Sequence, residues 1–215
     1  AACTLALSAC GGGSTTGNST GGEAAEGGTI TAAVAYETSN YHPSSTSSAL
    51  AMGSNWHVVE GLWELDMNTY EPFKALAAAD DPTQISETEY EVTLREDAKF
   101  SDGTDVTADD VVTSFERATA EGNIYAPMLV FIDKVEKKDE TTVTINLKYP
   151  FTLLKSRLAL VKIVPAAASD DELTAKPIGT GPWAYDTITE QSITFSPNPH
   201  YFGDVPATGD SMEGE

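Results

Sequence analysis

Three histidines and three pairs of adjacent aspartates are the side chains that could do acid–base or metal chemistry in this sequence. The histidines are His42, His57 and His200, which are too widely spaced for a zinc-ligand motif. The aspartate pairs are Asp80-Asp81, Asp109-Asp110 and Asp170-Asp171. Carboxylates that are neighbours in sequence seldom converge on one substrate, and the last two pairs suit helix starts. We therefore expect no metal site, no cofactor, no catalytic residue and no enzyme.

A glycine-rich stretch at residues 176–183 (KPIGTGPW) could bring backbone N–H groups close to a ligand. It is not a dinucleotide-binding fingerprint, because only Gly179-Thr180-Gly181 matches and Pro182 follows at once. The sequence also lacks a Gly-x-Ser-x-Gly elbow and a P-loop. The glycines therefore indicate a turn that can offer backbone N–H groups, and not a dinucleotide site.

Cys3 and Cys10 are the only cysteines, and the residues before Cys10 read ALSA. Small and apolar residues followed by a cysteine resemble the bacterial lipobox at the end of a signal peptide. We expect residues 1–9 to be a partial signal peptide and Cys10 to carry a lipid that anchors the protein to a membrane. Residues 10–28, the lipidated cysteine and a Gly/Ser/Thr-rich stretch, are expected to form a flexible tether.

The acidic balance of the chain limits its partners. Its 33 Asp and Glu residues outnumber 12 Lys and Arg, so the formal net charge of the 215 residues is −21. This charge argues against nucleic acid and against an anionic membrane face as electrostatic partners. The simplest interpretation of the negative charge is that it keeps the protein soluble. The alternative is that it attracts cationic ligands to a binding cleft.

The elements that would position these side chains are clearest at residues 90–117. Apolar and polar residues alternate over residues 90–95, which predicts a strand, and Ser101-Asp102-Gly103-Thr104 predicts a tight turn. Thr107 is placed as an N-cap, and Asp110 stands in for the capping-box glutamate. We therefore expect a strand, a turn and a capped helix that form one rigid scaffold.

Residue patterns predict further elements on both sides of that unit. Residues 143–147 alternate as a strand, which we expect to pair antiparallel with residues 90–94 under the helix that begins at Thr107. Residues 133–141 are charged and turn-like, and residues 125–132 predict a short helix or buried turn. The other predicted strands are residues 29–35, 161–164 and 191–196, and the other predicted helices are residues 50–65 and 149–160.

Candidate ligand contacts are polar or aromatic side chains at predicted strand ends and at the glycine-rich turn. The loop at residues 36–43 follows the first predicted strand, and ligands often bind beyond the carboxyl ends of strands. The candidates are Tyr36, Asn40, Tyr41, His57 and Trp183. Each could instead pack locally, and Glu60 could be either a cleft carboxylate or a solvated helix residue.

Three segments carry a family resemblance. Residues 94–117 (LREDAKFSDGTDVTADDVVTSFER) resemble the signature segment of the family 5 extracellular solute-binding proteins, the peptide and nickel receptors of ABC importers. Residues 177–183 resemble the family's Pro-Ile-Gly-Thr-Gly-Pro-Tyr segment, with Trp183 in place of the usual Tyr or Phe. Residues 198–202 (NPHYF) resemble its Asn-Pro-x-Tyr-Trp segment.

The resemblance implies a mixed α/β (α+β) fold, a lobe of the type II periplasmic-binding-protein kind. We expect a mixed sheet with helices and a small antiparallel subdomain. Residues 29–215 would be the N-terminal lobe, truncated, with a subdomain inserted at about residues 66–165 and the second lobe absent. The implied function is capture of di- or oligopeptides, or a related small solute, outside the membrane for delivery to the permease subunits of an ABC importer.

The implied localisation is extracytoplasmic, at the outer face of the cell membrane, or in the periplasmic space of a Gram-negative cell, with the protein as a monomer. Two other classes of function stay open at this point. One is a truncated adhesion or scaffolding lipoprotein without transport activity. The other is an enzyme that uses scattered carboxylates.

Overall fold

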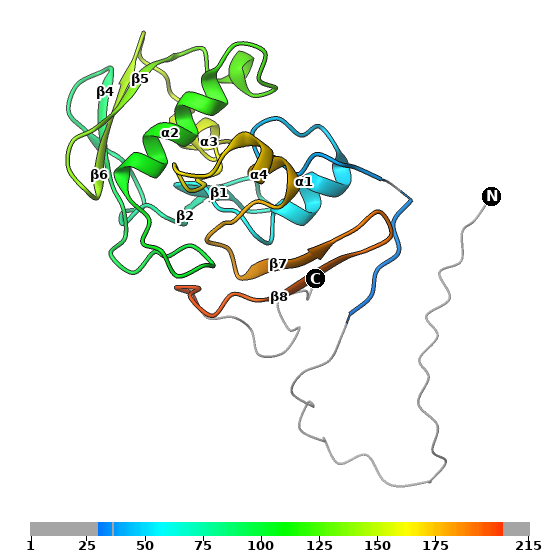
Figure 1. Ribbon diagram of the computed structural model, residues 1–215. Helices are drawn as coiled ribbons and strands as arrows, with labels where there is room; N and C mark the ends of the chain where they lie inside the picture. The colour runs from blue at the N-terminus through cyan, green and yellow to red at the C-terminus, as the bar shows by residue number, and fades with distance from the viewer. Residues whose placement is uncertain (1–29, 36, 204–215) are drawn as a thin grey trace, which may run out of the picture. The chain divides into compact units, whose positions relative to one another are not determined.

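A strand, a tight turn and a capped helix follow one another along the chain, in the order that the sequence predicts (Figure 1). The computed structural model describes residues 30–35 and 37–203. Strand β4 (Glu89–Thr93) leads to a turn in which Gly103 has a φ of 88°. The Asp102 carboxylate closes this turn by accepting hydrogen bonds from the backbone N and the hydroxyl of Thr104, at 3.0 and 2.7 Å. The turn prediction is confirmed.

Helix α2 (Ala108–Thr119) begins at Thr107 because one carboxylate satisfies the polar groups there. Asp110 Oδ2 accepts hydrogen bonds from the Thr107 backbone N and hydroxyl, both at 2.8 Å. Asp110 Oδ1 accepts from the backbone N of Ala166 at 2.7 Å, so the same side chain also ties the helix to a distant segment. The predicted cap is confirmed.

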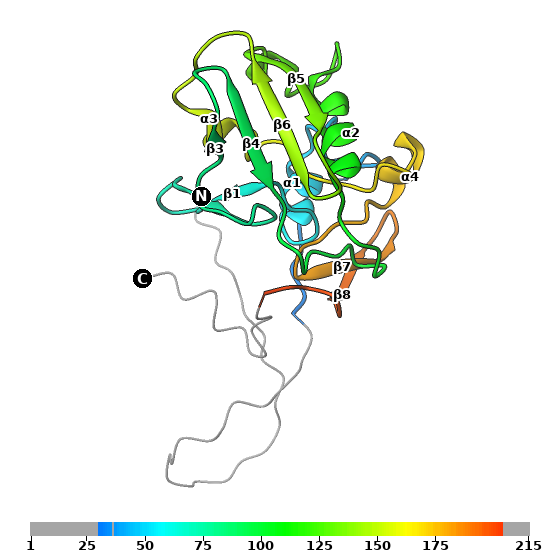
Figure 2. The same cartoon turned by 90° about the vertical axis from the view of Figure 1, so that its left-hand side faces the viewer.

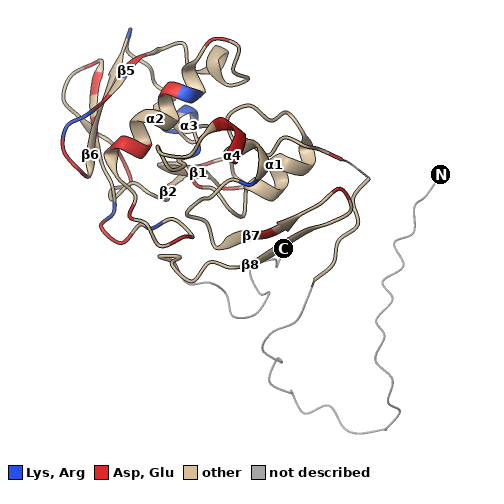
Figure 3. Cartoon of the chain, in the orientation of Figure 1, with Lys and Arg blue, Asp and Glu red and all other residues tan. Residues whose placement is uncertain are grey.

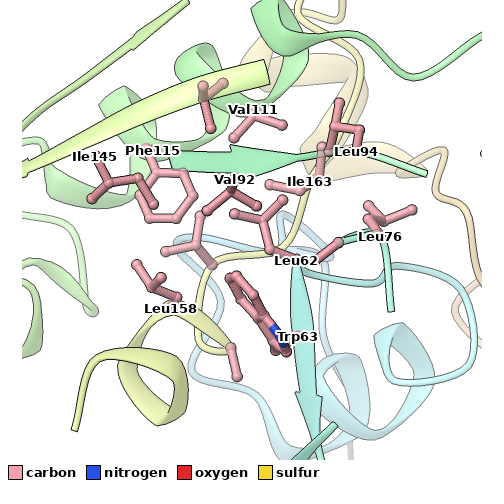
Figure 4. Packing of buried hydrophobic residues seen from close by; sticks show 14 of the residues in the cluster. Leu62, Trp63, Leu76, Val92, Leu94, Val111, Phe115, Ile145, Leu158 and Ile163 are labelled. Carbon is pink, nitrogen blue, oxygen red and sulfur yellow. The ribbon is translucent and has the colours of Figure 1, made fainter. Parts of the chain in front are cut away.

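A four-stranded antiparallel sheet packs against α2. Its order is β3 (Thr83–Gln84), β4, β6 (Thr142–Leu147) and β5 (Ile132–Lys137). Val92 of β4 stands opposite Val143 of β6, which confirms the predicted pairing. Val111 and Phe115 of α2 are buried with Val92, and Figure 2 shows the helix along one face of the sheet (Figures 2 and 4).

The remaining elements are short, and all the strand pairs in residues 30–35 and 37–203 are antiparallel. Strands β1 and β2 form one two-stranded sheet and β7 and β8 form another. The other elements are α1 (Ala49–Asn55), β1 (Trp63–Leu65), β2 (Pro72–Lys74), the 3₁₀ helix η1 (Ala126–Met128), α3 (Leu154–Leu158), α4 (Asp170–Ala175), β7 (Trp183–Ile188) and β8 (Ile193–Pro197). In the part of the chain that the structure describes, no helix is long and apolar enough to cross a bilayer.

Several element predictions are wrong. Residues 30–35 form no strand, and their exposed side chains pack on no neighbouring strand. Residues 133–141 contain most of β5, whose outer edge is charged as edge strands often are. Residues 161–164 contribute only an isolated bridge between Gly61 and Lys162. A strand needs a partner for its backbone groups, and sequence propensity does not supply one.

The predicted helices are also shorter than the apolar spacing suggested. The helix predicted at residues 50–65 ends at Asn55, and β1 begins at Trp63. The helix predicted at residues 149–160 is reduced to α3. In the first case the apolar residues belong to two separate groups of buried side chains, Val58 to one and Leu62 to the other, so their spacing does not report one face of a helix.

The buried apolar residues form two groups. The first cluster contains the apolar residues of α2 and the four-stranded sheet together with Leu62, Trp63 and Ile163 (Figure 4). The second cluster consists of Tyr41, Ala51, Val58, Val59, Val164, Leu173 and Tyr185. We call residues 60–61 and 162–163, where the chain passes from one cluster to the other, the neck.

The two segments of the neck are bonded to each other. Ile163 N donates to Glu60 O at 2.8 Å, and Gly61 bridges Lys162. Both clusters belong to one compact unit, Ala32–Val205. A subdomain at about residues 66–165 therefore stays a prediction.

Candidate functional site

The glycine-rich turn lies directly on the segment that begins at His57. Gly181 N donates to Val58 O at 2.9 Å, and Trp183 N donates to His57 O at 3.0 Å. The approach is close enough to require glycine, because a Cβ on Gly179 would lie 2.1 Å from Val58 O. Backbone hydrogen bonds therefore fix Trp183 beside His57.

The other motif segments meet at the same place. Ser101 N donates to Gly179 O at 2.9 Å, and the Asn198 side chain donates to Gly181 O at 2.8 Å. The imidazole of His200 lies over Gly103, where a Cβ would come 3.1 Å from its Nε2. We call this meeting point, residues 57–60, 100–104, 179–183 and 198–203, the motif junction.

Glu60 is the buried carboxylate of the motif junction. Its residue is 8% exposed, and its Oε2 accepts a hydrogen bond from the Thr180 hydroxyl at 3.0 Å. Burial raises the pKa of Glu60 to about 7, and the Thr180 hydrogen bond opposes that rise. Glu60 is therefore neither the exposed helix residue nor an open cleft carboxylate, the two roles that the sequence suggested.

The charged groups around Glu60 have partners of their own. Lys162 Nζ contacts both carboxylate oxygens of Glu64, at 2.6 and 2.5 Å. Arg95 pairs with Asp97 and places its guanidinium 3.7 Å from the centre of the Phe202 ring. The contact between Arg95 and Phe202 holds the start of residues 94–117 against residues 198–203.

The hydroxyl of Tyr201 belongs to the same environment. Burial raises the pKa of Tyr201 to about 12, and the nearby charge of Glu60 adds to the rise. Tyr201 is only partly buried and precedes Phe202, whose ring stacks at an angle on it, with 4.9 Å between the ring centres. The segment with the sequence NPHYF therefore covers one side of the Glu60 site.

The structure brings two of the five candidate ligand residues together. His57 is exposed, and the Trp183 residue is 36% exposed. Their backbones are hydrogen-bonded to each other, so both side chains start from one rigid point. They are the candidates best placed to contact a ligand.

Two other candidates are held by local packing. Tyr41 is 3% exposed, and its ring meets Tyr185 edge-on with 5.8 Å between the ring centres. Asn40 Oδ1 accepts a hydrogen bond from His42 N at 2.9 Å, which closes a local turn. Tyr36 and the expected lipidation site Cys10 lie outside the described residues.

Two exposed apolar residues next to His57 were missed. Trp56 and Met52 are 46% and 43% exposed, and Trp56 N donates to Met52 O at the end of α1. Large apolar side chains left in solvent beside a polar candidate are typical of binding surfaces. The one feature of the sequence that could have indicated this surface is that Trp56 directly precedes the candidate His57.

The described residues contain no group of three or more His, Cys, Asp or Glu side chains arranged to hold a metal ion. The motif junction is a rigid set of hydrogen-bonded turns that exposes an imidazole and an indole. Such surfaces bind by shape, stacking and hydrogen bonding.

Curated relatives match over part of their length. The probable D,D-dipeptide-binding periplasmic protein DdpA of Escherichia coli (strain K12) is 34% identical over 129 residues, which are 55% of this chain and 25% of DdpA. Protein XP55 of Streptomyces lividans is 33% identical over 182 residues, which are 77% of this chain and 32% of XP55. The chain thus spans about a third or less of the length of these relatives.

A solved structure with the same fold is AgaA from A. tumefaciens R10 in complex with agropinic acid. It is 27% identical, with a TM-score of 0.70 over 78% of this chain and 35% of AgaA. The fold is that of a type II periplasmic binding protein, as expected. The model of the "bacterial extracellular solute-binding proteins, family 5 Middle" matches residues 71–211. This protein belongs to the family 5 bacterial extracellular solute-binding proteins.

Proposed function

We propose that this chain is the N-terminal lobe of a lipoprotein that captures di- or oligopeptides outside the membrane and delivers them to the permease of an ABC importer. The carrying observation is the motif junction, which fixes His57 and Trp183 side by side and leaves both exposed. The D,D-dipeptide named for DdpA supports a peptide ligand, and the agropinic acid bound to AgaA makes an opine the nearest departure.

In this proposal binding is closure of two lobes around the ligand. The chain supplies one lobe, and a ligand that contacts both lobes favours the closed state. Cys10 carries the lipid anchor, residues 10–28 form the tether, and the protein acts as a monomer at the outer face of the membrane. It binds and releases its ligand without chemical change, so it is not an enzyme.

The test is ligand titration of the ¹⁵N-labelled 215-residue chain by NMR, which detects weak binding. Di- to tetrapeptides are expected to shift the Trp183 indole N–H and the His57 backbone amide in the millimolar range, since one lobe makes only part of the contacts. His57→Ala and Trp183→Ala should each weaken this binding. Phe73→Ala is the matched control, because Phe73 is an exposed aromatic residue on β2 and is not one of the residues of the motif junction.

Two results would contradict the proposal. Micromolar or tighter peptide affinity of the chain alone would show that a second lobe is not needed. Peptide-induced shifts confined to residues outside the motif junction would show that His57 and Trp183 are not the ligand contacts. An opine series run in parallel decides between the two ligand classes.

A further inference from the structure

Glu60 is a buried carboxyl group at which a charge is costly. It stands in the neck, between Val59 of the second cluster and Leu62 of the first. Its residue is 8% exposed. A carboxylate at such a place loses most of its hydration, so the neutral acid is favoured unless a cation compensates.

The nearby cations are engaged elsewhere. Four titratable groups face Glu60: Glu64 of β1, Lys162 of the neck, Arg95 after β4, and Tyr201 of the motif junction. Lys162 is bonded to both oxygens of Glu64, and Arg95 is bonded to both oxygens of Asp97. The Thr180 hydroxyl donates a hydrogen bond to Glu60 Oε2 at 3.0 Å, and the Tyr201 hydroxyl also interacts with the Glu60 carboxyl group; neither partner is a cation.

The hydrogen bond from Thr180 to Glu60 joins the two segments that present the candidate ligand contacts. Thr180 lies between the glycines that pack on Val58, and Trp183 follows three residues later. Glu60 likewise follows His57 by three residues. The Glu60–Thr180 pair is therefore a side-chain contact between the same two segments whose backbone bonds fix His57 beside Trp183.

We propose that Glu60 is a positioning residue whose protonation keeps residues 179–183 seated on residues 57–60 and so sets the geometry of His57 and Trp183. The assignment of these two residues as ligand contacts rests on the proposed function. When Glu60 loses its proton, the carboxylate needs water, and water reaches it by lifting the glycine-rich turn. The contact is then closed in mildly acidic solution and opens more often as the pH rises through neutral.

The direction of the pKa shift agrees with this mechanism. Burial raises the pKa of Glu60 from 4.5 to about 7 in the closed state. In the open, hydrated state the pKa returns toward 4.5, so proton binding favours the closed state. By linkage, opening should become about tenfold more frequent between about pH 6 and about pH 8.

The first test is a carbon-13 NMR titration of the side-chain carboxyl groups in the 215-residue chain, with no ligand present. The Glu60 signal is identified by its absence in Glu60→Gln. A midpoint within about one unit of 7 supports the proposal, whereas a midpoint at the ordinary glutamate value overturns it. Thr180→Val removes the opposing hydrogen bond and is expected to move the midpoint further upward.

The second test is hydrogen exchange of single amides, corrected for intrinsic base catalysis. The Gly181 and Trp183 amides donate to Val58 and His57, and the Phe115 amide inside α2 serves as the internal reference. Relative to Phe115, protection of the first two should fall about tenfold from about pH 6 to about pH 8. The fall should vanish in Glu60→Gln and persist in the matched control Glu190→Gln, since Glu190 is exposed.

A pH-independent protection ratio in the wild-type chain, or the same fall in Glu60→Gln, overturns the proposal. Neither readout involves a ligand. A failure of the peptide titration and a failure of the proton linkage are therefore separate results.

Discussion

At the scale of single residues, two glycines show how different surroundings give the same residue type opposite roles. A Cβ on Gly179 would lie 2.1 Å from Val58 O, whereas a Cβ on Gly53 in α1 meets nothing within 4 Å. Gly179→Ala is expected to lower the free energy of unfolding by about 3 kcal/mol or more, because backbone must move. Gly53→Ala should raise it by about 0.5–1 kcal/mol, because alanine is the better helix former. Urea denaturation of the two variants and the wild-type chain measures both changes in the free energy of unfolding.

Equal effects of the two alanines would contradict this assignment. So would a Gly179→Ala variant that keeps both wild-type stability and the protected amide of Gly181. The comparison is matched in chemistry, since each variant adds one methyl group at one glycine.

The turn at residues 100–104 is expected to support the fold without selecting the ligand. Gly103→Val strains a residue with a φ of 88° and pushes its side chain toward His200. Asp102→Ala removes the acceptor of two Thr104 hydrogen bonds. Each change should lower the free energy of unfolding by about 1–3 kcal/mol, which lowers the melting temperature by several degrees. Neither change should alter which ligands the protein prefers.

Gly122→Ala is the control for this prediction. Gly122 has the same φ of 88° but open space around it, so its alanine variant measures backbone strain alone. A changed ligand spectrum at an unchanged melting temperature in Gly103→Val would show that the turn contacts the ligand.

Single residues could be predicted from the sequence where their partners are close along the chain. Asp102 bonds Thr104 and Asp110 bonds Thr107, and both roles were predictable from turn and capping chemistry. The burial of Tyr41 depends on Tyr185, a member of the same cluster that lies 144 residues further along the chain. No local pattern encodes that contact.

At the scale of elements, the start of α2 is the most strongly specified boundary. Asp110 is 8% exposed and accepts hydrogen bonds from Thr107 and from Ala166 N. Asp110→Ala is expected to lower the free energy of unfolding by about 2–3 kcal/mol, because it removes a cap and leaves three partly buried donors without their acceptor. Thermal and urea unfolding measure the loss.

Asp109→Ala is the matched control on the same helical turn. The Asp109 carboxylate is 60% exposed and pairs with Lys137 at 2.8 Å, and such surface pairs contribute about 0–1 kcal/mol. Similar losses in the two variants would mean that dipole and charge, rather than the buried cap, fix the helix start.

Strands with a clear apolar–polar alternation could be predicted from the sequence. Elements next to the neck, where the chain passes from one cluster to the other, could not. Strands β4 and β6 alternate clearly and pair with each other. The residues of β1 were predicted as part of a helix because the apolar residues before them are divided between two clusters, with Val58 in the second and Leu62 in the first. Periodicity assumes one buried side, and that assumption fails where a chain crosses between clusters.

At the scale of the whole molecule, the negative charge should weaken the folded state through self-repulsion. Figure 3 shows Asp and Glu on the helices, strands and loops of the chain, and the formal net charge is −21 (Figure 3). Raising sodium chloride from about 20 mM to about 300 mM is expected to raise the melting temperature, since the Debye length falls below the spacing of surface carboxylates.

The measurement is calorimetry over a salt series at constant pH. Choline chloride at the same ionic strength is the control, because screening does not depend on the cation. A melting temperature that is flat or falls with both salts would show that favourable ion pairs, such as Lys137 with Asp109, outweigh the repulsion.

The segments that identify the family in the sequence meet in one place in the structure, which explains why their residues are so specific. Residues 100–104, 179–183 and 198–203 are far apart along the chain, and hydrogen bonds and close packing join them around Gly103 and Gly179. The ligand contacts were harder to predict. Exposure of His57 and burial of Tyr41 are results of global packing, and both residue types are compatible with either outcome.

The neck also makes residues 62–161, which contain most of the first cluster, a cassette with adjacent ends. Gly61 and Lys162 are bridge partners, so the chain enters and leaves residues 62–161 at a single point. A cassette with adjacent ends can be cut out and its ends rejoined by a short linker, with little loop-closure entropy to overcome. It can equally be replaced by the corresponding segment of a relative. Recombination between family members at Gly61 and Lys162 would exchange the sheet and α2 as a block, while the surface with His57 and Trp183 stays with its own parent.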